Sequence, residues 1–211
     1  MAEDQRISLG PEDTVALWQG GKDGWNAWVN ENPDSNISFA NVDFKQYRNP
    51  PGNYPDLWPF MHFHFPNGGK DFTNTNFGEG WVSFGHTKFG EGLVDFSFCK
   101  FRSGSLDFAY AVFNEAIVRF PSTDIGGIGV NFEWAMFDKS ALMFAGVEKK
   151  ENEFTFTNAT FTESQTSFPA DSQTCSLNFV KAHFKNSCLD LYEINFEDCK
   201  VIFLRSDFRG K

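Results

Sequence analysis

Residues 84–144 read FGHTKFGEGLVD, FSFCKFRSGSLD, FAYAVFNEAIVR, FPSTDIGGIGVN and FEWAMFDKSALM, closed by Phe144, so that each block of 12 residues begins on a phenylalanine. The spacing holds from Phe72 to Phe168 and, after the loss of one residue, continues at Phe179, Leu191 and Phe203. The chain has 211 residues, of which 27 are Phe and only 6 Trp and 4 Tyr. A flat apolar ring is required at many equivalent places, which is typical of a repeat architecture.

Two further apolar columns run beside this one, five residues after and two residues before each leading Phe. The first holds Phe77, Phe89, Phe101, Phe113, Ile125, Phe137, Phe161, Phe184, Phe196 and Phe208, and the second holds Val82, Val94, Leu106, Val118, Val130, Leu142, Phe154, Leu177, Leu189 and Val201. A small residue usually stands two positions before each. Alternation with a period of two indicates short β-strands with both residues pointing inward. Units that cannot bury their own apolar face must stack, which predicts a β-solenoid.

The length of one coil follows from where the pattern is irregular. Units starting at Phe120, Phe144 and Phe168 carry Ile125, Lys149 and Gln173 in the second column, whereas the intervening units keep Phe there. Irregularity with a period of 24 predicts a coil of 24 residues, with sides of roughly five, seven, five and seven residues and layers about 4.8 Å apart. A coil of 12 would overfill an interior that packs like an organic crystal.

The small-x-large pattern resembles the pentapeptide-repeat family, most closely in Ala40-Asn41-Val42-Asp43-Phe44, Gly104-Ser105-Leu106-Asp107-Phe108 and Ala159-Thr160-Phe161-Thr162-Glu163. Residues 17–28 (LWQGGKDGWNAW) also look like the leader of many such proteins. The resemblance implies an all-β fold, a right-handed quadrilateral β-helix. Alternate units here are seven residues long instead of five, so the expected coil has 24 residues instead of 20. The family is functionally broad, so the resemblance fixes fold better than activity.

We expect one domain with two parts, a helical cap over residues 1–34 and a solenoid over residues 35–211. Pro11 marks a helix start, and Trp25, Trp28 and Val29 share one face of a second short helix that ends before Pro33. A solenoid end exposes strand edges, so a capping element is needed. Residues 48–70 break the register, and their Pro-rich part predicts a loop excursion from an early coil.

Composition excludes several classes of protein. The formal net charge of −10 argues against direct binding to nucleic acid. The acidic start and the lack of a long apolar run predict a cytoplasmic protein without membrane contact. The four cysteines, Cys99, Cys175, Cys188 and Cys199, show no CxxC spacing, which argues against zinc and predicts free thiols in a reducing compartment. Whether Cys175 and Cys199 pair is left open by the sequence.

The sequence contains no constellation that indicates an enzyme, a cofactor or a metal site. His62 and His64 form half a metal site at most, because no third ligand is spaced to complete it. His86 and His183 project outward and lie far apart. Gly-x-Ser-x-Gly, His-Glu-x-x-His and P-loop motifs are absent from the sequence. We therefore expect no catalytic residues.

Function should then lie on the outer faces, where residues 24 apart become stacked neighbours. Exposed aromatic clusters mark partner surfaces. The candidate interaction residues are Phe98, Tyr110, Val112, Trp134 and Met136. A second outward group near the C-terminus predicts a homodimer seam and consists of Val180, Tyr192, Ile202 and Leu204.

Three functional classes remain open. The first is a binding or scaffold protein that uses the aromatic face to contact a protein partner. The second, drawn from the resemblance, is an acidic DNA mimic that protects a DNA topoisomerase; against it, Lys139 interrupts the outward column of Glu91, Glu115 and Glu163. The third is ice binding, suggested by threonines from Thr155 to Thr166, but these do not recur at the coil period.

Overall fold

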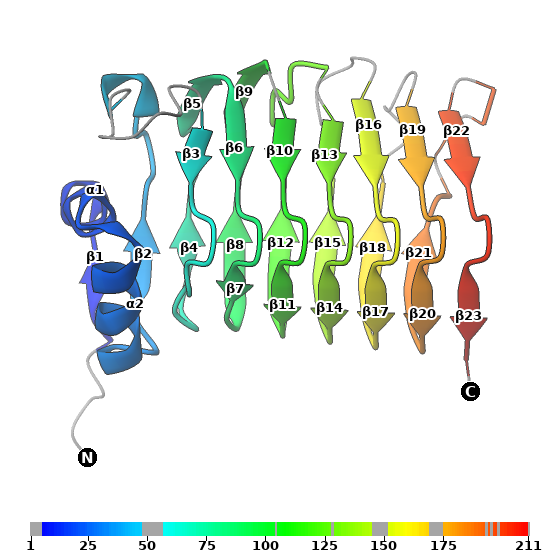
Figure 1. The fold of residues 1–211 in the computed structure, drawn as a ribbon, viewed down its shortest axis with the longest axis horizontal. Coiled ribbons are helices and arrows are strands. Elements are labelled where there is room, and N and C mark those ends of the chain that lie inside the picture. The colour runs from blue at the N-terminus through cyan, green and yellow to red at the C-terminus, as the bar shows by residue number, and fades with distance from the viewer. Residues whose placement is uncertain are drawn as a thin grey trace.

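The computed structural model describes residues 6–47, 57–103, 105–127, 129–144, 152–168, 175–192, 194, 196–197 and 199–210. It is an all-β solenoid of stacked coils with a short helical cap at the N-terminal end (Figure 1). Each coil adds one strand to each of up to four parallel sheets, because every described strand pairs with the strand one coil before or after it. The expected fold class is confirmed.

Three long sheets and one short sheet form the sides of the coil. The first sheet contains β1 (Ser8–Leu9), β2 (Asn36–Ser38), β4 (Lys70–Asp71), β8 (Gly92–Asp95), β12 (Ala116–Arg119), β15 (Ala141–Met143), β18 (Gln165–Ser167) and β21 (Cys188–Asp190). The second contains β3 (Leu57–Pro59), β6 (Trp81–Ser83), β10 (Ser105–Asp107), β13 (Gly129–Asn131), β16 (Asn152–Thr155), β19 (Cys175–Asn178) and β22 (Cys199–Ile202). The third contains β7 (Lys88–Phe89), β11 (Val112–Asn114), β14 (Met136–Asp138), β17 (Thr160–Thr162), β20 (His183–Lys185) and β23 (Asp207–Arg209), and the fourth contains β5 (Asn76–Glu79) and β9 (Lys100–Ser103).

The strand register gives the coil length directly. Val112 lies opposite Met136, and Leu106 lies opposite Val130, so one coil is 24 residues, as the period of the irregularities predicts. One later step is a residue shorter, since Asn152 lies opposite Cys175. The first full step is longer, because Ile37 lies opposite Lys70 and accommodates a chain insertion.

The interior consists of columns of parallel phenylalanine rings. Phe113 stacks on Phe89 and Phe137 with ring centroids 4.7 and 4.8 Å apart and interplanar angles of 3° and 1°. Rings from neighbouring columns meet edge to face, an arrangement that the aromatic quadrupole favours. The columns begin two coils earlier than the sequence pattern suggests, because Phe39 stacks on Phe72 and Phe60 stacks on Phe84.

The small residues of the repeat add a second ladder. The Oγ1 of Thr87 donates a hydrogen bond to the carbonyl oxygen of Phe60 at 2.6 Å, and that of Thr123 donates to Phe96 at 2.7 Å. The same bond, 27 residues back along the chain, is made by Cys99 and Ser140. A small side chain at this position therefore leaves room for the rings and can also tie one coil to the coil before it.

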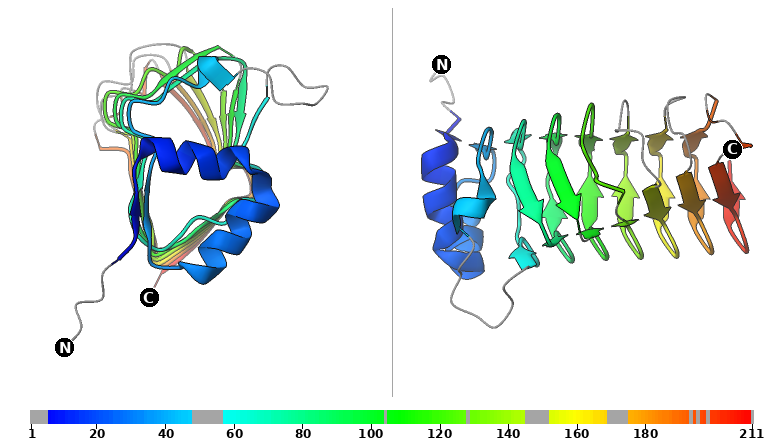
Figure 2. Two further views of the ribbon diagram at one scale, coloured as in Figure 1. Left: turned by 90° about the vertical axis from the view of Figure 1, so that its left-hand side faces the viewer. Right: turned by 90° about the horizontal axis from the view of Figure 1, so that it is seen from above.

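The cap consists of α1 (Pro11–Gln19) and α2 (Gly21–Glu31), which lie across the N-terminal end of the solenoid (Figure 2). Trp25 is fully buried, stacks on Phe39, and donates its indole N–H to the carbonyl of His64 at 2.8 Å. Strand β1 extends the first sheet by pairing with β2, which the sequence analysis missed. After the first coil has closed, η1 (Phe44–Tyr47) leads away from it.

Three details differ from expectation. Residues 48–56 lie outside the described part, but residues 57–70 are not an excursion: Leu57 pairs with Trp81 in the ordinary register. Phe196, expected inside, is 62% exposed, because no described coil follows it. Cys99 and Cys188 are free thiols, whereas Cys199 is disulfide-bonded, so the prediction of free thiols is wrong for Cys199.

Candidate interaction surface

The corner between the second and third sheets carries a row of exposed rings. His62 stacks on His86 at 4.8 Å, His86 on Tyr110 at 4.6 Å, and Tyr110 on Trp134 at 6.2 Å, with the last two pairs parallel to within 2°. Tyr110 and Trp134 are 47% and 48% exposed. We call these four residues the aromatic ladder. They form a continuous aromatic strip along the outside of the rod, which the apolar core does not need.

The backbone makes this strip costly. All seven residues of this corner column have φ between 54° and 62°: His62, His86, Tyr110, Trp134, Asn158, Lys181 and Arg205. The left-handed region suits Gly, Asn and Asp, and it is strained for bulky side chains. Asn158 is the residue that the backbone prefers there, whereas Tyr110 and Trp134 are the costly ones. Strained residues that persist are candidates for function.

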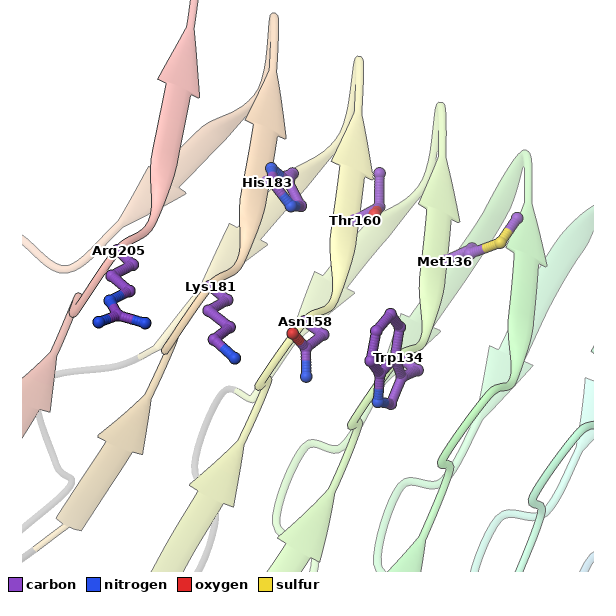
Figure 3. Close-up of a pocket in the computed structure, with 7 residues that line it drawn as sticks. All are labelled: Trp134, Met136, Asn158, Thr160, Lys181, His183 and Arg205. Carbon is purple, nitrogen blue, oxygen red and sulfur yellow. The ribbon is translucent and has the colours of Figure 1, made fainter.

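A shallow pocket of about 420 Å³ begins at the C-terminal end of the ladder (Figure 3). Trp134 and the 52% exposed Met136 form its apolar end. Asn158 and Thr160 follow one coil later, and then come Lys181, His183 and Arg205. The surface thus changes from aromatic to cationic along one column of the same corner.

The predicted interaction residues divide between two corners. Tyr110, Val112, Trp134 and Met136 gather on the ladder side, since Val112 and Met136 are register partners beside the rings. Phe98 is 55% exposed but belongs to the corner between the first and fourth sheets, in a column with Asn74 and Ser122. The structure does not bring it to the ladder. Sequence reasoning missed His62 and His86 as ring partners, although their 24-residue spacing from Tyr110 was available as a signal.

The residues of the predicted seam lie at the C-terminal end, but on different sides of the coil. Leu204 is 63% exposed beside the ladder corner, with Ile202 and Val180 half-buried close by, whereas the 90% exposed Tyr192 follows β21 of the first sheet. The core rings Phe203 and Phe208 are also exposed there, at 37% and 58%, because each is stacked on one side only by a described ring.

Acidic residues do not form an unbroken track. Lys139 lies one coil from Glu115 and its Nζ donates to Glu115 Oε1 at 3.1 Å, so this column is partly neutralised. The hydrogen bond to Glu115 raises the pKa of Lys139. On the first sheet, burial alone would raise the pKa of Asp95, but hydrogen bonds from Arg119 and Ser97 hold it below its ordinary value.

Lys70 is the one described lysine whose side chain replaces an apolar residue of the core column. It occupies the register position of Ile37 and Val94 and is 1% exposed. Its ammonium donates to the carbonyl oxygens of Gly68, Gly90 and Glu91, which close the neighbouring corner. Burial lowers the pKa of Lys70 to about 7. The geometry is that of an internal tie between two coils.

No cluster of three or more His, Cys, Asp or Glu that could hold a metal occurs among the described residues. His64 lies apart from the ladder, and burial followed by the charge of Lys88 lowers its pKa. In the part of the chain that the structure covers, no helix is long and apolar enough to cross a membrane.

Comparison with known proteins found no matching family model and no matching curated protein. Among solved structures, the chain is similar to a trypsin-treated variant of QnrB1, a plasmid-mediated fluoroquinolone resistance protein, with 17% identity, 74% of this chain and 89% of that chain covered, and a TM-score of 0.22. It is also similar to HetL, a pentapeptide-repeat protein involved in heterocyst differentiation regulation from the cyanobacterium Nostoc, with 8% identity, coverages of 79% and 84%, and a TM-score of 0.22.

The chain resembles pentapeptide-repeat proteins. HetL carries that family name in its description, but likenesses with a TM-score of 0.22 carry no argument here. The four sheets of the solenoid agree independently with the quadrilateral coil that the sequence pattern implies. What this chain does must be argued from its own surface.

Proposed function

We propose that this chain is a non-enzymatic, cytoplasmic binding protein whose rigid solenoid presents the aromatic ladder, with Val112 and Met136, to a protein partner. The observation that supports the proposal is the row of stacked, half-exposed rings at corner positions whose backbone disfavours them. Aromatic residues and Met are enriched in protein interfaces, and a contiguous exposed cluster marks a partner surface better than scattered apolar residues do.

Rigidity is part of the proposed role. The rings are fixed by their neighbours along the rod and by a backbone tied into parallel sheets on both sides of the corner. A preordered surface loses little conformational entropy on association, so the binding energy is not spent on ordering the ladder.

The test is a double variant in which Tyr110→Asn and Trp134→Asn copy the residue that the next coil already has at this corner. The exposed Trp81, in β6 on the second sheet, supplies the matched control Trp81→Asn. Purified wild type and control should capture the same partner from native cytosol with equal Kd, whereas the double variant should lose it while its Tm stays equal or rises. Capture that survives the double substitution refutes the proposal.

We further propose that the C-terminal end pairs with a second copy of this chain. The end presents the unpaired outer edges of β21, β22 and β23 together with Phe203, Leu204 and Phe208. Such edges and apolar cross-sections promote association. Sedimentation should show a dimer for the wild type and a monomer for Leu204→Glu; a wild type that stays monomeric at high protein concentration contradicts this.

A further inference from the structure

The stacking geometry of the ladder decides which part of it can bind a planar molecule. Tyr110 and Trp134 are parallel to within 2°, and so are His86 and Tyr110. Rings stacked in this way cover each other's faces and expose only their edges along the length of the stack. A free ring face exists only at an end of the ladder, which excludes the flat row of outward faces that would support a sugar chain.

The described free end is at Trp134. Its one described ring contact is with Tyr110, and its other side borders the pocket (Figure 3). The next residue of the corner is Asn158, whose side chain is shorter than a ring and carries one amide acceptor and two amide donors. The ladder therefore stops where the corner column continues, and the position after Trp134 offers an apolar face beside a polar amide.

Two cations follow in the same column. Lys181 and Arg205 lie one and two coils beyond Asn158, about 5 and 10 Å along the rod. Both are exposed, and neither has a printed ion pair with a described residue. The neighbouring carboxylate of Asp207 is already engaged by Arg209 at 2.6 Å and faces His183 at 3.9 Å. In a chain of net charge −10, these two cations form a local site of opposite sign.

We propose that this pocket binds a free nucleoside monophosphate. The base continues the ladder by stacking on the open face of Trp134, the amide of Asn158 hydrogen-bonds its edge, and Lys181 and Arg205 hold the phosphate. The order along the rod, ring face, then amide, then cations, matches the order of base and phosphate in one nucleotide. Base stacking on an aromatic residue and charge-assisted bonds to phosphate are both well suited to the residues present.

A longer nucleic acid fits this surface less well. Its backbone carries one charge per phosphate, and the acidic chain would repel every phosphate beyond the first. This site lies beyond the protein-binding role of the ladder and can be tested apart from it, because Lys181 and Arg205 are not part of the ladder.

The test is isothermal titration calorimetry of the full chain with adenosine 5′-monophosphate, adenosine, orthophosphate and a short single-stranded oligonucleotide. We expect the monophosphate to bind with a millimolar or tighter Kd, and adenosine and orthophosphate each to bind at least about tenfold more weakly. Trp134→Asn should weaken the monophosphate by about tenfold or more, the loss of one stacking contact. Lys181→Gln with Arg205→Gln should weaken it similarly but leave the binding of adenosine unchanged, and Trp81→Asn should change nothing.

Circular dichroism of every variant confirms that each is folded before titration. The proposal is overturned by a monophosphate that does not bind at millimolar concentration, by orthophosphate that binds as tightly as the nucleotide, or by equal affinity of adenosine and its monophosphate. Binding that Trp134→Asn leaves intact, or binding of the oligonucleotide alone, also overturns it. Loss of the protein partner in the ladder variant, with no nucleotide binding in the wild type, would refute this site and leave the proposed function standing.

Discussion

Replacing Phe113 with Ala in the middle of the rod should destabilise the protein far more than replacing Phe208 in the same column at its end. Phe113 has no exposed surface, is stacked on Phe89 and Phe137, and meets the edges of Phe108 and Phe132 at centroid distances of 6.1 and 6.4 Å. Truncation opens a cavity between two fixed rings, because both neighbours are held by their own coils.

The expected cost of Phe113→Ala is about 3–5 kcal/mol, the usual range for a fully buried Phe. Phe208 is already 58% exposed and is stacked on one ring only, Phe184 at 4.7 Å. In proportion to its buried surface, Phe208→Ala should cost less than about 2 kcal/mol. The two substitutions are chemically identical and occupy the same column, so their difference reports position alone.

Thermal unfolding followed by circular dichroism measures both effects, with about 2–4 °C of Tm expected per kcal/mol for a chain of this size. Urea unfolding provides an independent ranking of the variants. Equal losses for the two variants would refute the reasoning, because the end of the rod would then be covered. A loss below about 1 kcal/mol for Phe113→Ala would show that the neighbouring rings collapse into the space.

Three other substitutions test the polar ties between coils. Lys70→Met should remove a pH dependence: because the pKa of Lys70 is lowered to about 7, the unfolded chain binds more protons above that pH, so wild-type stability should rise from about pH 7 towards pH 10 by up to about 1.4 kcal/mol per unit, and urea unfolding of the Met variant should lack this rise. Thr87→Val keeps the shape of the side chain but deletes its bond to the Phe60 carbonyl, and should lower the free energy of unfolding by about 1–2 kcal/mol; an unchanged urea midpoint would deny the tie any role. Arg119→Gln removes the partner that lowers the pKa of Asp95, so the stability that the wild type holds above about pH 4 and loses in acid should shrink, which acid titration of the two proteins would show as converging curves if the idea holds and as parallel curves if it does not.

The sequence predicts the solenoid well because its code is spatially periodic. Columns of Phe and small residues at a constant interval can be explained only by stacking, and the period of the exceptions distinguishes a 24-residue coil from a 12-residue one. The early rings Phe39 and Phe60 escaped the pattern, because an insertion of chain separates them from the regular repeat.

The surface is less predictable, because outward positions obey no packing rule. That Tyr110 and Trp134 are neighbours follows from their spacing, but that Phe98 lies on another corner requires knowing which turn belongs to which side. The tie made by Lys70 also lacks a sequence signal, since a lysine at an apolar column position reads as a break in the repeat until its three carbonyl partners are seen.

Uniform register makes the rod modular in length. Because Asp95 and Arg119 are register partners one coil apart, removing residues 96–119 would join Asp95 to Phe120 and leave every remaining column aligned. His86 would then take the place of Tyr110 beside Trp134, and the distance between the helical cap and the cationic end would shrink by about 4.8 Å. The coil is thus a unit of measure, and the separation of two binding surfaces on this chain can be set in whole steps without redesigning either surface.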